Sequence, residues 1–337
     1  MKNILLAVLR CPQTGQTLQL ERLGSDAVYQ PLDEIESGWL VSEDGRNRYP
    51  IRDGIPRFVP ESNYADNFGM QWNLFSKTQL DSRSGYPISA NRFWRATKWK
   101  PEELRGQWVL DAGCGAGRFA EIALQAGAKV LALDYSSAVD ACYANLRQYH
   151  NLYVIQADIY HIPLQTQFFS FVYCLGVLQH TPDVHLAFVG LPRMLAHGGR
   201  IVVDVYEKSR LRMILSSKYL VRPLTKRLPK SLLFRILQKT VPPMFAVSNA
   251  AQQIPLIGPH LRRLVPVANN MSMYPLSYKQ HLEWALLDTF DWYSPQYDQP
   301  QSADSLREWL IESGLTDIEV EKAGHLVGRG VAKRGSS

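Results

Sequence analysis

Cysteine is scarce and scattered in this chain of 337 residues. The four cysteines are Cys11, Cys114, Cys142 and Cys174. They form no CxxC pair and no framework of the kind found in disulfide-rich domains, which favours a reducing, cytoplasmic compartment. Residues 1–60 contain one cysteine and no histidine. We therefore expect no metal in this region, because a structural zinc ion needs four sulfur or nitrogen ligands.

Long apolar runs, internal repeats and low-complexity tracts are missing as well. The N-terminal run "ILLAVL" spans six residues and ends at Arg10, which is too short for a usual signal-peptide core. No stretch approaches the roughly 20 apolar residues that a membrane-spanning helix needs. The net charge of +6 and a pI of about 9.0 are compatible with an anionic substrate, a nucleic acid or a membrane surface.

The pattern of the chain predicts three regions. Residues 1–60 read as a small β-rich domain with turns at Asp44-Gly45 and Asp53-Gly54, and residues 61–106 as a helical leader. From residue 107 onward, apolar strands alternate with helices, which predicts an α/β domain with a parallel sheet over residues 107–337. The alternation stops at 207–290, a proline-containing helical insertion, and resumes with one helix and two strands.

A glycine-rich turn interrupts this alternation at "VLDAGCGAGRF", residues 109–119. Glycines allow close approach of a ligand to the backbone, and the start of the following helix attracts negatively charged groups. Acids close three successive strands, at Asp111, Asp134 and Asp158. The carboxylate of Asp134 could accept hydrogen bonds from ribose hydroxyls, and that of Asp158 from an adenine amine. Three acids and the spacing of the third glycine argue against a pyrophosphate-containing nicotinamide cofactor.

Five segments in order resemble the class I S-adenosylmethionine (SAM)-dependent methyltransferases: "VLDAGCGAGRF", "LALDYS", "QADIYHIP", "FVYCLGVLQHTPD" and "LPRMLAHGGRIVVDVY". The resemblance covers about 107–206 and 302–333. It implies a Rossmann-like, seven-stranded sheet that ends in an antiparallel hairpin, with SAM as cofactor. The residues that it implies as SAM contacts are Asp111, Gly113, Gly115, Gly117, Asp134, Tyr135, Asp158 and Ile159, with Leu175 near the methyl donor.

Two further segments carry resemblances of their own. "LRCPQTGQTLQLE" and "YPIRDGIPRFV" are similar to a Trm112-like, zinc-ribbon-derived module, but the paired cysteines of its metal-binding members are missing, so a structural role is predicted. "NFGMQWNLFSKTQLDSRSG" with "NRFWR" resembles the leader of bacterial methyltransferases linked to small-molecule or surface-glycan pathways. In this interpretation Phe68, Gln71, Trp72 and Arg92 close over the cofactor. The alternative is ordinary aromatic core packing.

Candidates for catalysis and acceptor recognition follow the glycine turn. His180, in "VLQHTPD", is a candidate general base, with a structural turn residue as the alternative. Residues 207–239 hold ten lysines or arginines and one acid, Glu207. This excess predicts recognition of an anionic acceptor or of anionic lipid headgroups, and a solvated basic face is the alternative. Candidates to line the acceptor pocket are Tyr274, Tyr278, His281, Asp288 and Asp291.

These observations predict a SAM-dependent methyltransferase that acts on an oxygen or nitrogen atom of a small-molecule, natural-product or glycan-type acceptor, with an anionic acceptor favoured. A tRNA or rRNA methyltransferase and a catalytically inactive SAM-binding scaffold are the alternatives. The basic insertion is compatible with RNA, but no recognisable RNA-binding module accompanies it, so nucleic acid is the less favoured partner. Peripheral membrane contact through the insertion stays open, as do the acceptor and the oligomeric state.

Overall fold

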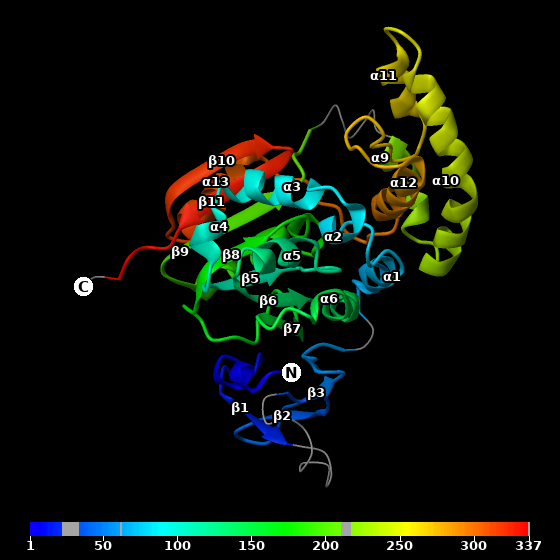
Figure 1. Cartoon of the computed structure of the whole chain (residues 1–337). Helices are drawn as coiled ribbons and strands as arrows, with labels where there is room; N and C mark the ends of the chain where they lie inside the picture. Colours follow the sequence, from blue (N-terminus) through cyan, green and yellow to red (C-terminus); the bar gives the residue numbers. More distant parts are fainter. Residues whose placement is uncertain (22–33, 61–62, 210–216, 336–337) are drawn as a thin grey trace.

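The computed structural model describes residues 1–21, 34–60, 63–209 and 217–335. A seven-stranded sheet forms the centre of the molecule, a small four-stranded sheet lies below it, and a helical insertion lies to its right (Figure 1). The strands of the large sheet are β5 (Trp108–Ala112), β6 (Lys129–Asp134), β7 (Leu152–Gln156), β8 (Phe169–Cys174), β9 (Leu195–Val205), β10 (Thr316–Ala323) and β11 (His325–Val331).

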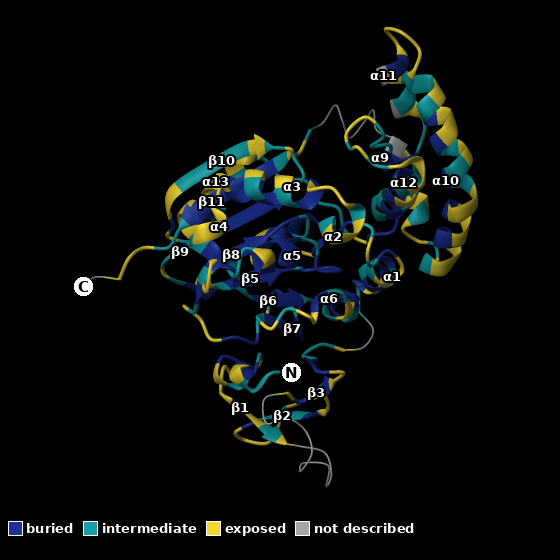
Figure 2. Cartoon of the chain, in the orientation of Figure 1, coloured by how far each residue is buried: buried dark blue, intermediate teal, exposed yellow. Residues whose placement is uncertain are grey.

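The central strands are apolar on both faces because helices cover both faces of the sheet. Leu131 and Leu133 of β6 pack into one hydrophobic cluster, and Val130 and Ala132 pack into another. Figure 2 shows the resulting buried layer at the centre of the fold. The helices before, between and after these strands are α1 (Asp66–Leu74), α2 (Asp81–Ser84), α3 (Ile88–Thr97), α4 (Pro101–Leu104), α5 (Arg118–Gln125), α6 (Ala138–Leu146), α7 (Val184–Val189) and α13 (Ala303–Glu312).

The strand order is β10-β11-β9-β8-β5-β6-β7. β11 runs antiparallel to both of its neighbours, and the pairs formed by β9, β8, β5, β6 and β7 are parallel. The predicted α/β fold with a terminal antiparallel hairpin is therefore confirmed. The parallel strands place their carboxyl ends, and the acids that follow them, along one edge of the sheet.

One predicted element differs from the structure. The apolar spacing of "DVHLAFVGLPRMLAHGG" predicts a helix over residues 183–199, but α7 ends at Val189 and a 3₁₀ turn begins at Pro192. Residues 195–199 belong to β9 instead. Proline has no amide hydrogen and cannot continue the hydrogen-bonded ladder of a helix, so the helix stops ahead of it.

The N-terminal domain is an antiparallel sheet of four strands: β1 (Leu18–Glu21), β2 (Gly38–Ser42), β3 (Arg48–Arg52) and β4 (Ile55–Pro56). Its predicted turns are present, with Gly45 and Gly54 at φ of 69° and 75°. Cys11 is buried, and its sulfur lies 3.4 Å from the Tyr49 hydroxyl.

The N-terminal domain is fixed to the free edge of the large sheet next to β7. The Phe58 amide donates to the Gln156 carbonyl at 2.8 Å. The Arg57 guanidinium donates to the Gln156 side chain at 2.9 Å and pairs with Asp140 at 2.7 Å. Leu9 and Leu40 share one hydrophobic cluster with strands of the large sheet. The small domain therefore covers an otherwise open sheet edge with backbone and apolar contacts.

The insertion is helical, as predicted, and follows β9. Its helices are α9 (Ser217–Thr225), α10 (Lys230–Gln252), α11 (Gly258–Leu261) and α12 (Tyr278–Tyr293). A separate hydrophobic cluster joins α10 to α12 through residues such as Leu237, Val241 and Phe290. Within the ranges that the structure describes, none of the helices combines the length and the apolar character needed to cross a membrane. The boundaries at 60, 106, 207 and 290 remain our proposal for the division of the chain.

Candidate functional site

The glycine turn connects β5 to α5 at the carboxyl edge of the sheet. Gly113, Gly115 and Gly117 have φ of 92°, 52° and 93°. A Cβ at residue 113 would lie 2.3 Å from a methyl carbon of Val177, and a Cβ at residue 117 would lie 2.6 Å from a methyl carbon of Leu146. The fold therefore requires glycine at these two positions for both space and backbone conformation.

Asp134, at the end of β6, holds this turn in place. Its Oδ2 accepts a hydrogen bond from the Gly115 amide at 2.9 Å, and its Oδ1 accepts from the amide and hydroxyl of Ser136 at 2.9 and 2.7 Å. A carboxylate offers about four acceptor positions, so roughly one stays available for a ligand hydroxyl. Burial raises the pKa of Asp134 above its ordinary value.

We expect Asp134→Ala to weaken SAM binding by about 1.5–3 kcal/mol, because hydrogen bonds to a charged group are lost together with the support of the turn. Isothermal titration of the purified variant measures this loss. Ser136→Ala is the matched control, since it removes one donor and keeps the carboxylate. Unchanged SAM affinity in Asp134→Ala would refute the ribose assignment.

Asp111 lies beneath the turn and is almost completely buried. Burial, with a smaller contribution from the charge of Asp134, raises the pKa of Asp111 to about 8. Its Oδ2 has no hydrogen-bond partner among the described residues. The carboxyl group is therefore mostly protonated at pH 7, and a cationic ligand above the turn would favour its ionisation.

The raised pKa of Asp111 predicts a pH-dependent stability. Between about pH 4 and 8 the folded chain keeps a proton that the unfolded chain releases, so the free energy of unfolding falls as the pH rises. Asp111→Asn removes this dependence. We expect the variant to gain at most about 1.4 kcal/mol relative to the wild type between about pH 6 and 7, measured by denaturant unfolding. A constant difference between the two proteins over this range would contradict the assignment.

Aromatic rings enclose the edge next to Asp158. Tyr135 stacks on Tyr64 with ring centres 4.9 Å apart, and Tyr64 meets Tyr297 edge-on at 5.8 Å. Asp158 is partly exposed, and its Oδ1 accepts from the Tyr160 amide at 3.0 Å. The neighbouring Ile159 is buried. The sequence pointed to Tyr135, Asp158 and Ile159, but not to Tyr64 and Tyr297, which come from distant segments.

Arg92 of α3 reaches the end of β9. Its guanidinium pairs with Asp204 at 2.8 Å, and Asp204 also accepts from the Gly176 amide at 2.5 Å. Arg92 holds the pKa of Asp204 below its ordinary value even though the carboxylate is buried. Leu175 is buried beside this network. Asp204 lies at the carboxyl end of β9, as Asp134 lies at the carboxyl end of β6. The argument from strand ends therefore applies to Asp204 as well.

The leader helix α1 covers the turn from above. The Trp72 indole nitrogen would lie 3.2 Å from a Cβ at residue 115, so the ring rests against the glycine backbone. The Gln71 amide donates to Asp291 at 3.4 Å, and its buried Oε1 has no partner among the described residues. The Phe68 ring lies 5.2 Å from that of His180. The structure thus brings Phe68, Gln71 and Trp72 to the edge that carries the acids.

His180 lies in the 3₁₀ turn Leu178–His180 after β8 and is buried. Burial lowers its pKa below the ordinary histidine value. Its Nδ1 lies 3.1 Å from the Tyr297 carbonyl oxygen, which can only accept. The proton of the neutral ring is therefore on Nδ1, and Nε2 carries a lone pair.

Helix α12 brings two acids toward the same region. Burial and the charge of Asp291 raise the pKa of Asp288 to about 7, and Asn270 donates to its carboxylate at 2.8 Å. Tyr278 is half exposed, and its ring lies 5.6 Å from that of Phe245. His281 is buried against the Tyr274 carbonyl at 3.1 Å. Of the five residues from the sequence, Asp291 contacts the leader helix through Gln71.

Arg118 opens α5, directly after the glycine turn. It donates to the neutral side chains of Ser89 at 2.9 Å and Gln79 at 3.0 Å, and its guanidinium lies over the rings of Phe119 and Trp284. Burial and the charge of Arg92 lower its pKa to about 10. In the part of the chain that the structure describes, no carboxylate lies within ion-pair distance of it.

Three cations of the insertion have partners within the chain that the sequence did not reveal. Lys218 is buried and pairs with Asp298 at 2.5 Å, and Arg222 lies 3.9 Å from the same carboxylate. Lys230 donates to the backbone carbonyls of Lys226 and Ser294. These three charges are therefore occupied within the insertion and its return segment. Arg210 and Arg212 lie outside the described residues.

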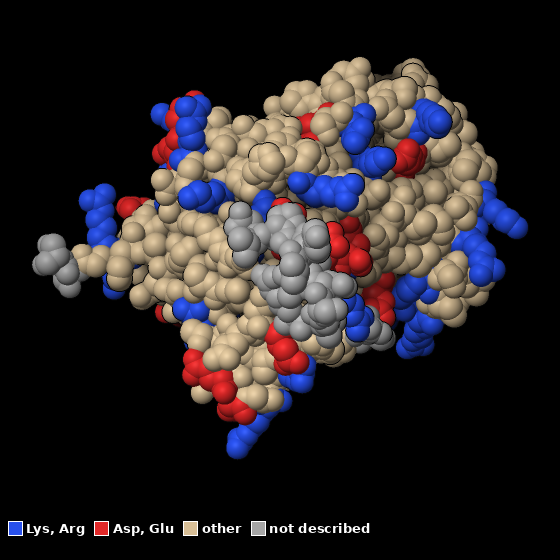
Figure 3. Space-filling model, turned by 60° about the horizontal axis from the view of Figure 1, so that its bottom comes forward, with Lys and Arg blue, Asp and Glu red and all other residues tan. Residues whose placement is uncertain are grey.

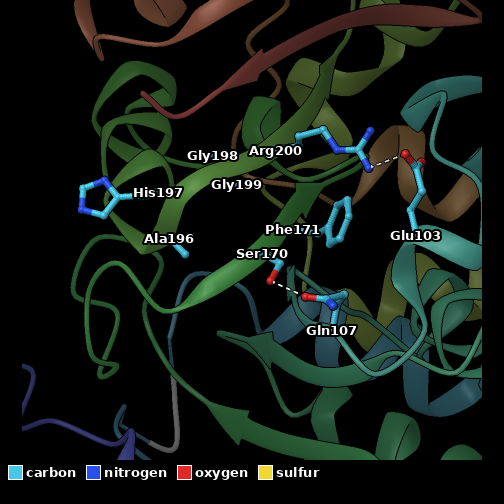
Figure 4. Close-up of a pocket in the computed structure, with 9 residues that line it drawn as sticks. All are labelled: Glu103, Gln107, Ser170, Phe171, Ala196, His197, Gly198, Gly199 and Arg200. Carbon is cyan, nitrogen blue, oxygen red and sulfur yellow. Dashed lines mark hydrogen bonds and ion pairs between the residues drawn. The ribbon is translucent and has the colours of Figure 1, made fainter. Parts of the chain in front are cut away.

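A hollow of about 310 Å³ lies on the opposite edge, at the amino ends of β8 and β9 (Figure 4). Arg200 pairs with Glu103 at 3.0 Å across it, and Ser170 donates to Gln107 at 2.8 Å. These polar groups satisfy one another. The hollow is therefore separate from the predicted cofactor edge and offers it no residue.

Comparisons with known sequences match two parts of the chain. A profile described as a methyltransferase domain matches residues 110–203, and a profile for Trm112p-like proteins matches residues 2–54. A ubiquinone biosynthesis O-methyltransferase of Coxiella burnetii is 30% identical over 129 residues, which covers 36% of this chain and 55% of that protein. A demethylmenaquinone methyltransferase of Thermobifida fusca is 31% identical over 120 residues, covering 34% and 51%.

The chain thus spans about half the length of the curated relatives it matches. Among solved structures, a complex of the Haloferax volcanii Trm112 methyltransferase activator with a methyltransferase superposes at a TM-score of 0.44 and 15% identity, covering 80% of this chain and 99% of that one. This likeness is too weak to add to the fold described above. The two sequence profiles assign residues 110–203 to a methyltransferase domain and residues 2–54 to a Trm112p-like domain, and the strand order and the glycine turn are those that the resemblance to class I SAM-dependent methyltransferases implied.

Proposed function

We propose that this protein transfers a methyl group from SAM to an oxygen or nitrogen atom of a small-molecule acceptor held beneath α12. The observation that carries the proposal is the glycine turn fixed by Asp134, with the leader helix and α12 closing over it. SAM, when bound, supplies an electrophilic methyl group on a sulfonium ion. The protein's own contribution is to bind both molecules in line and to exclude water.

The residues at the edge fit this ligand. Asp134 has acceptor capacity left for a ribose hydroxyl, and Asp158 is exposed enough to accept from an adenine amine. Tyr135 and Tyr64 supply an aromatic wall for a planar base. The amine and the sulfonium of SAM are positively charged. Unpaired oxygens of Asp111 and Gln71 and the carboxylate of Asp204 lie close to where these groups would bind.

His180 is the proposed general base for an acceptor hydroxyl. The Tyr297 carbonyl fixes the tautomer that leaves Nε2 able to take a proton, and burial keeps the ring neutral at pH 7. An amine acceptor that is already neutral would not need this step. The dependence of turnover on His180 therefore also indicates which kind of atom is methylated.

We expect His180→Ala to lower kcat by roughly tenfold to a hundredfold with a hydroxyl acceptor, and to leave SAM affinity within about twofold. Single-turnover kinetics with labelled SAM measures the first quantity, and calorimetry measures the second. Tyr206→Leu is the matched control, because the Tyr206 ring lies 5.5 Å from the imidazole and its removal alters the packing but keeps the base. Equal turnover of His180→Ala and wild type would remove the base assignment.

Arg118 is the proposed binding group for an anionic acceptor. Its charge is unpaired in the described structure, and the rings of Phe119 and Trp284 hold the guanidinium in place. An acceptor carboxylate or phosphate could pair with both of its terminal nitrogens.

Mass spectrometry of a cell extract incubated with the protein and isotopically labelled SAM tests the acceptor class. A labelled, acidic small molecule is expected, whereas label confined to RNA would favour the tRNA or rRNA alternative.

A further inference from the structure

The insertion is unusual in its charge. Residues 208–282 contain thirteen of the chain's 37 lysines and arginines and none of its 31 acids, which leaves 24 basic and 31 acidic residues in the rest of the chain. Since Lys218, Arg222 and Lys230 are occupied internally, they do not explain this bias. Lys226, Arg227, Arg235 and Lys239 are exposed. Lysines and arginines project from the edge of the molecule where the insertion lies (Figure 3).

Helix α10 has two sharply different faces. Its inner face, with Leu233, Leu237, Val241 and Phe245, is buried against α12 and its neighbours. The opposite face of an ordinary surface helix is polar. Here the exposed positions are mostly apolar or basic: Leu232, Arg235, Ile236, Lys239, Pro243, Ala246, Val247 and Ala250; the exposed polar residues are Ser231 and Gln238.

The apolar character continues past the end of α10. Ile254, Ile257 and Leu264 are exposed, and Leu256 is 94% exposed. Eleven of the sixteen exposed large hydrophobic side chains in the described structure lie between residues 220 and 278. α10 and α11 form the outer margin of the molecule, on the far side of α12 from the sheet (Figure 1). We call this surface, residues 232–264, the outer face.

We propose that the outer face binds the surface of a membrane that contains anionic lipids. Aliphatic side chains can enter the boundary between headgroups and acyl chains, and flanking lysines and arginines pair with lipid phosphates. The absence of acids over 75 consecutive residues removes the repulsion that an anionic surface would otherwise meet. The acidic remainder of the chain would turn this side of the molecule toward the membrane.

The composition of the outer face distinguishes this partner from RNA. Single-stranded nucleic acids are held by aromatic rings that stack on bases between basic groups. Among the described residues from 232 to 264 one aromatic ring, that of His260, is exposed, and the exposed large hydrophobic side chains are leucine, isoleucine or valine. Such side chains suit hydrocarbon and offer no stacking surface for a base.

Vesicle co-sedimentation of the full chain tests the proposal. The assay contains neither SAM nor an acceptor, so its result is independent of the proposed methyl transfer. The probes are vesicles of phosphatidylcholine alone and vesicles that also contain phosphatidylglycerol. We expect binding to the anionic vesicles that falls with added salt, and little binding to the neutral ones. Arg235→Glu with Lys239→Glu should weaken binding at least about tenfold, and Leu232→Ser with Ile236→Ser should also weaken it.

The matched control is Arg307→Glu with Lys333→Glu, which changes the net charge equally; Arg307 belongs to α13 and Lys333 follows β11, two elements on the other side of the molecule from α10 (Figure 1). All these side chains are exposed, so melting temperature and SAM affinity should stay at wild-type values in each variant. The proposal is overturned if the wild type stays in the supernatant with both vesicle types, or if the control pair loses as much binding as the α10 pair. Tight binding to RNA without vesicle binding also overturns it.

Discussion

Gly113→Ala is expected to abolish measurable SAM binding and to destabilise the folded chain. The residue has φ of 92°, outside the range that alanine adopts readily, and its new Cβ would lie 2.3 Å from Val177 Cγ2. Backbone strain of this kind costs about 1–3 kcal/mol. Valine is rigid at χ1 and cannot swing aside, so overpacking adds roughly another 1–3 kcal/mol. Chemical unfolding and calorimetry on the same preparation measure the two effects.

Gly115→Ala is the matched comparison for this prediction. Its φ of 52° lies within the left-handed region that alanine can enter, and its nearest neighbour would be 3.2 Å away on Trp72. We expect a smaller loss of stability than in Gly113→Ala. The double variant Gly113→Ala with Val177→Ala should recover the packing part and keep the strain. Equal stability of the two glycine variants would contradict the geometry of the turn.

Asp298→Ala is expected to lower the free energy of unfolding by about 3–5 kcal/mol, because it leaves the buried cations Lys218 and Arg222 without their counter-charge. The side chains of the pair Lys218–Asp298 are 9% and 1% exposed. Asp298 lies next to Tyr297, whose carbonyl holds His180. Loosening α9 should therefore also reduce turnover. Denaturant unfolding followed by tryptophan fluorescence measures the stability loss.

Glu21→Ala is the control for this second prediction. Glu21 pairs with Arg48 at 2.9 Å, but both side chains are about half exposed. Exposed ion pairs contribute roughly 0–1 kcal/mol, so this variant should be close to wild type. If Asp298→Ala proves as stable as Glu21→Ala, the pair within the insertion does not anchor α9.

The sequence predicted the framework of the fold because local patterns determine it. Apolar runs such as "LYVIQ" and the helices between them carry their own periodicity, and the carboxyl ends of parallel strands always meet at one edge. The helix predicted over 183–199 is wrong because the apolar periodicity continues past Pro192, whereas the helix cannot.

The site was predictable only where its residues follow a strand. Asp111, Asp134 and Asp158 carry that signal, and Asp204 carries it too. Tyr64, Tyr297 and Asp298 reach the site through long connections, and no spacing in the sequence relates them to the glycine turn. The lysines and arginines of the insertion can be counted in the sequence, but their ion-pair partners cannot be predicted from it. Lys218 and Arg222 lie against Asp298, which comes from a distant part of the chain.

Isothermal titration of the full-length protein with SAM and, separately, with NADH tests the central claim most directly. The glycine turn, the three strand-end acids and the aromatic wall of Tyr64 and Tyr135 predict one SAM bound per chain and no heat with NADH. A cationic ligand above the turn favours ionisation of the buried Asp111, whereas a pyrophosphate opposes it. Binding of NADH without binding of SAM would contradict the account.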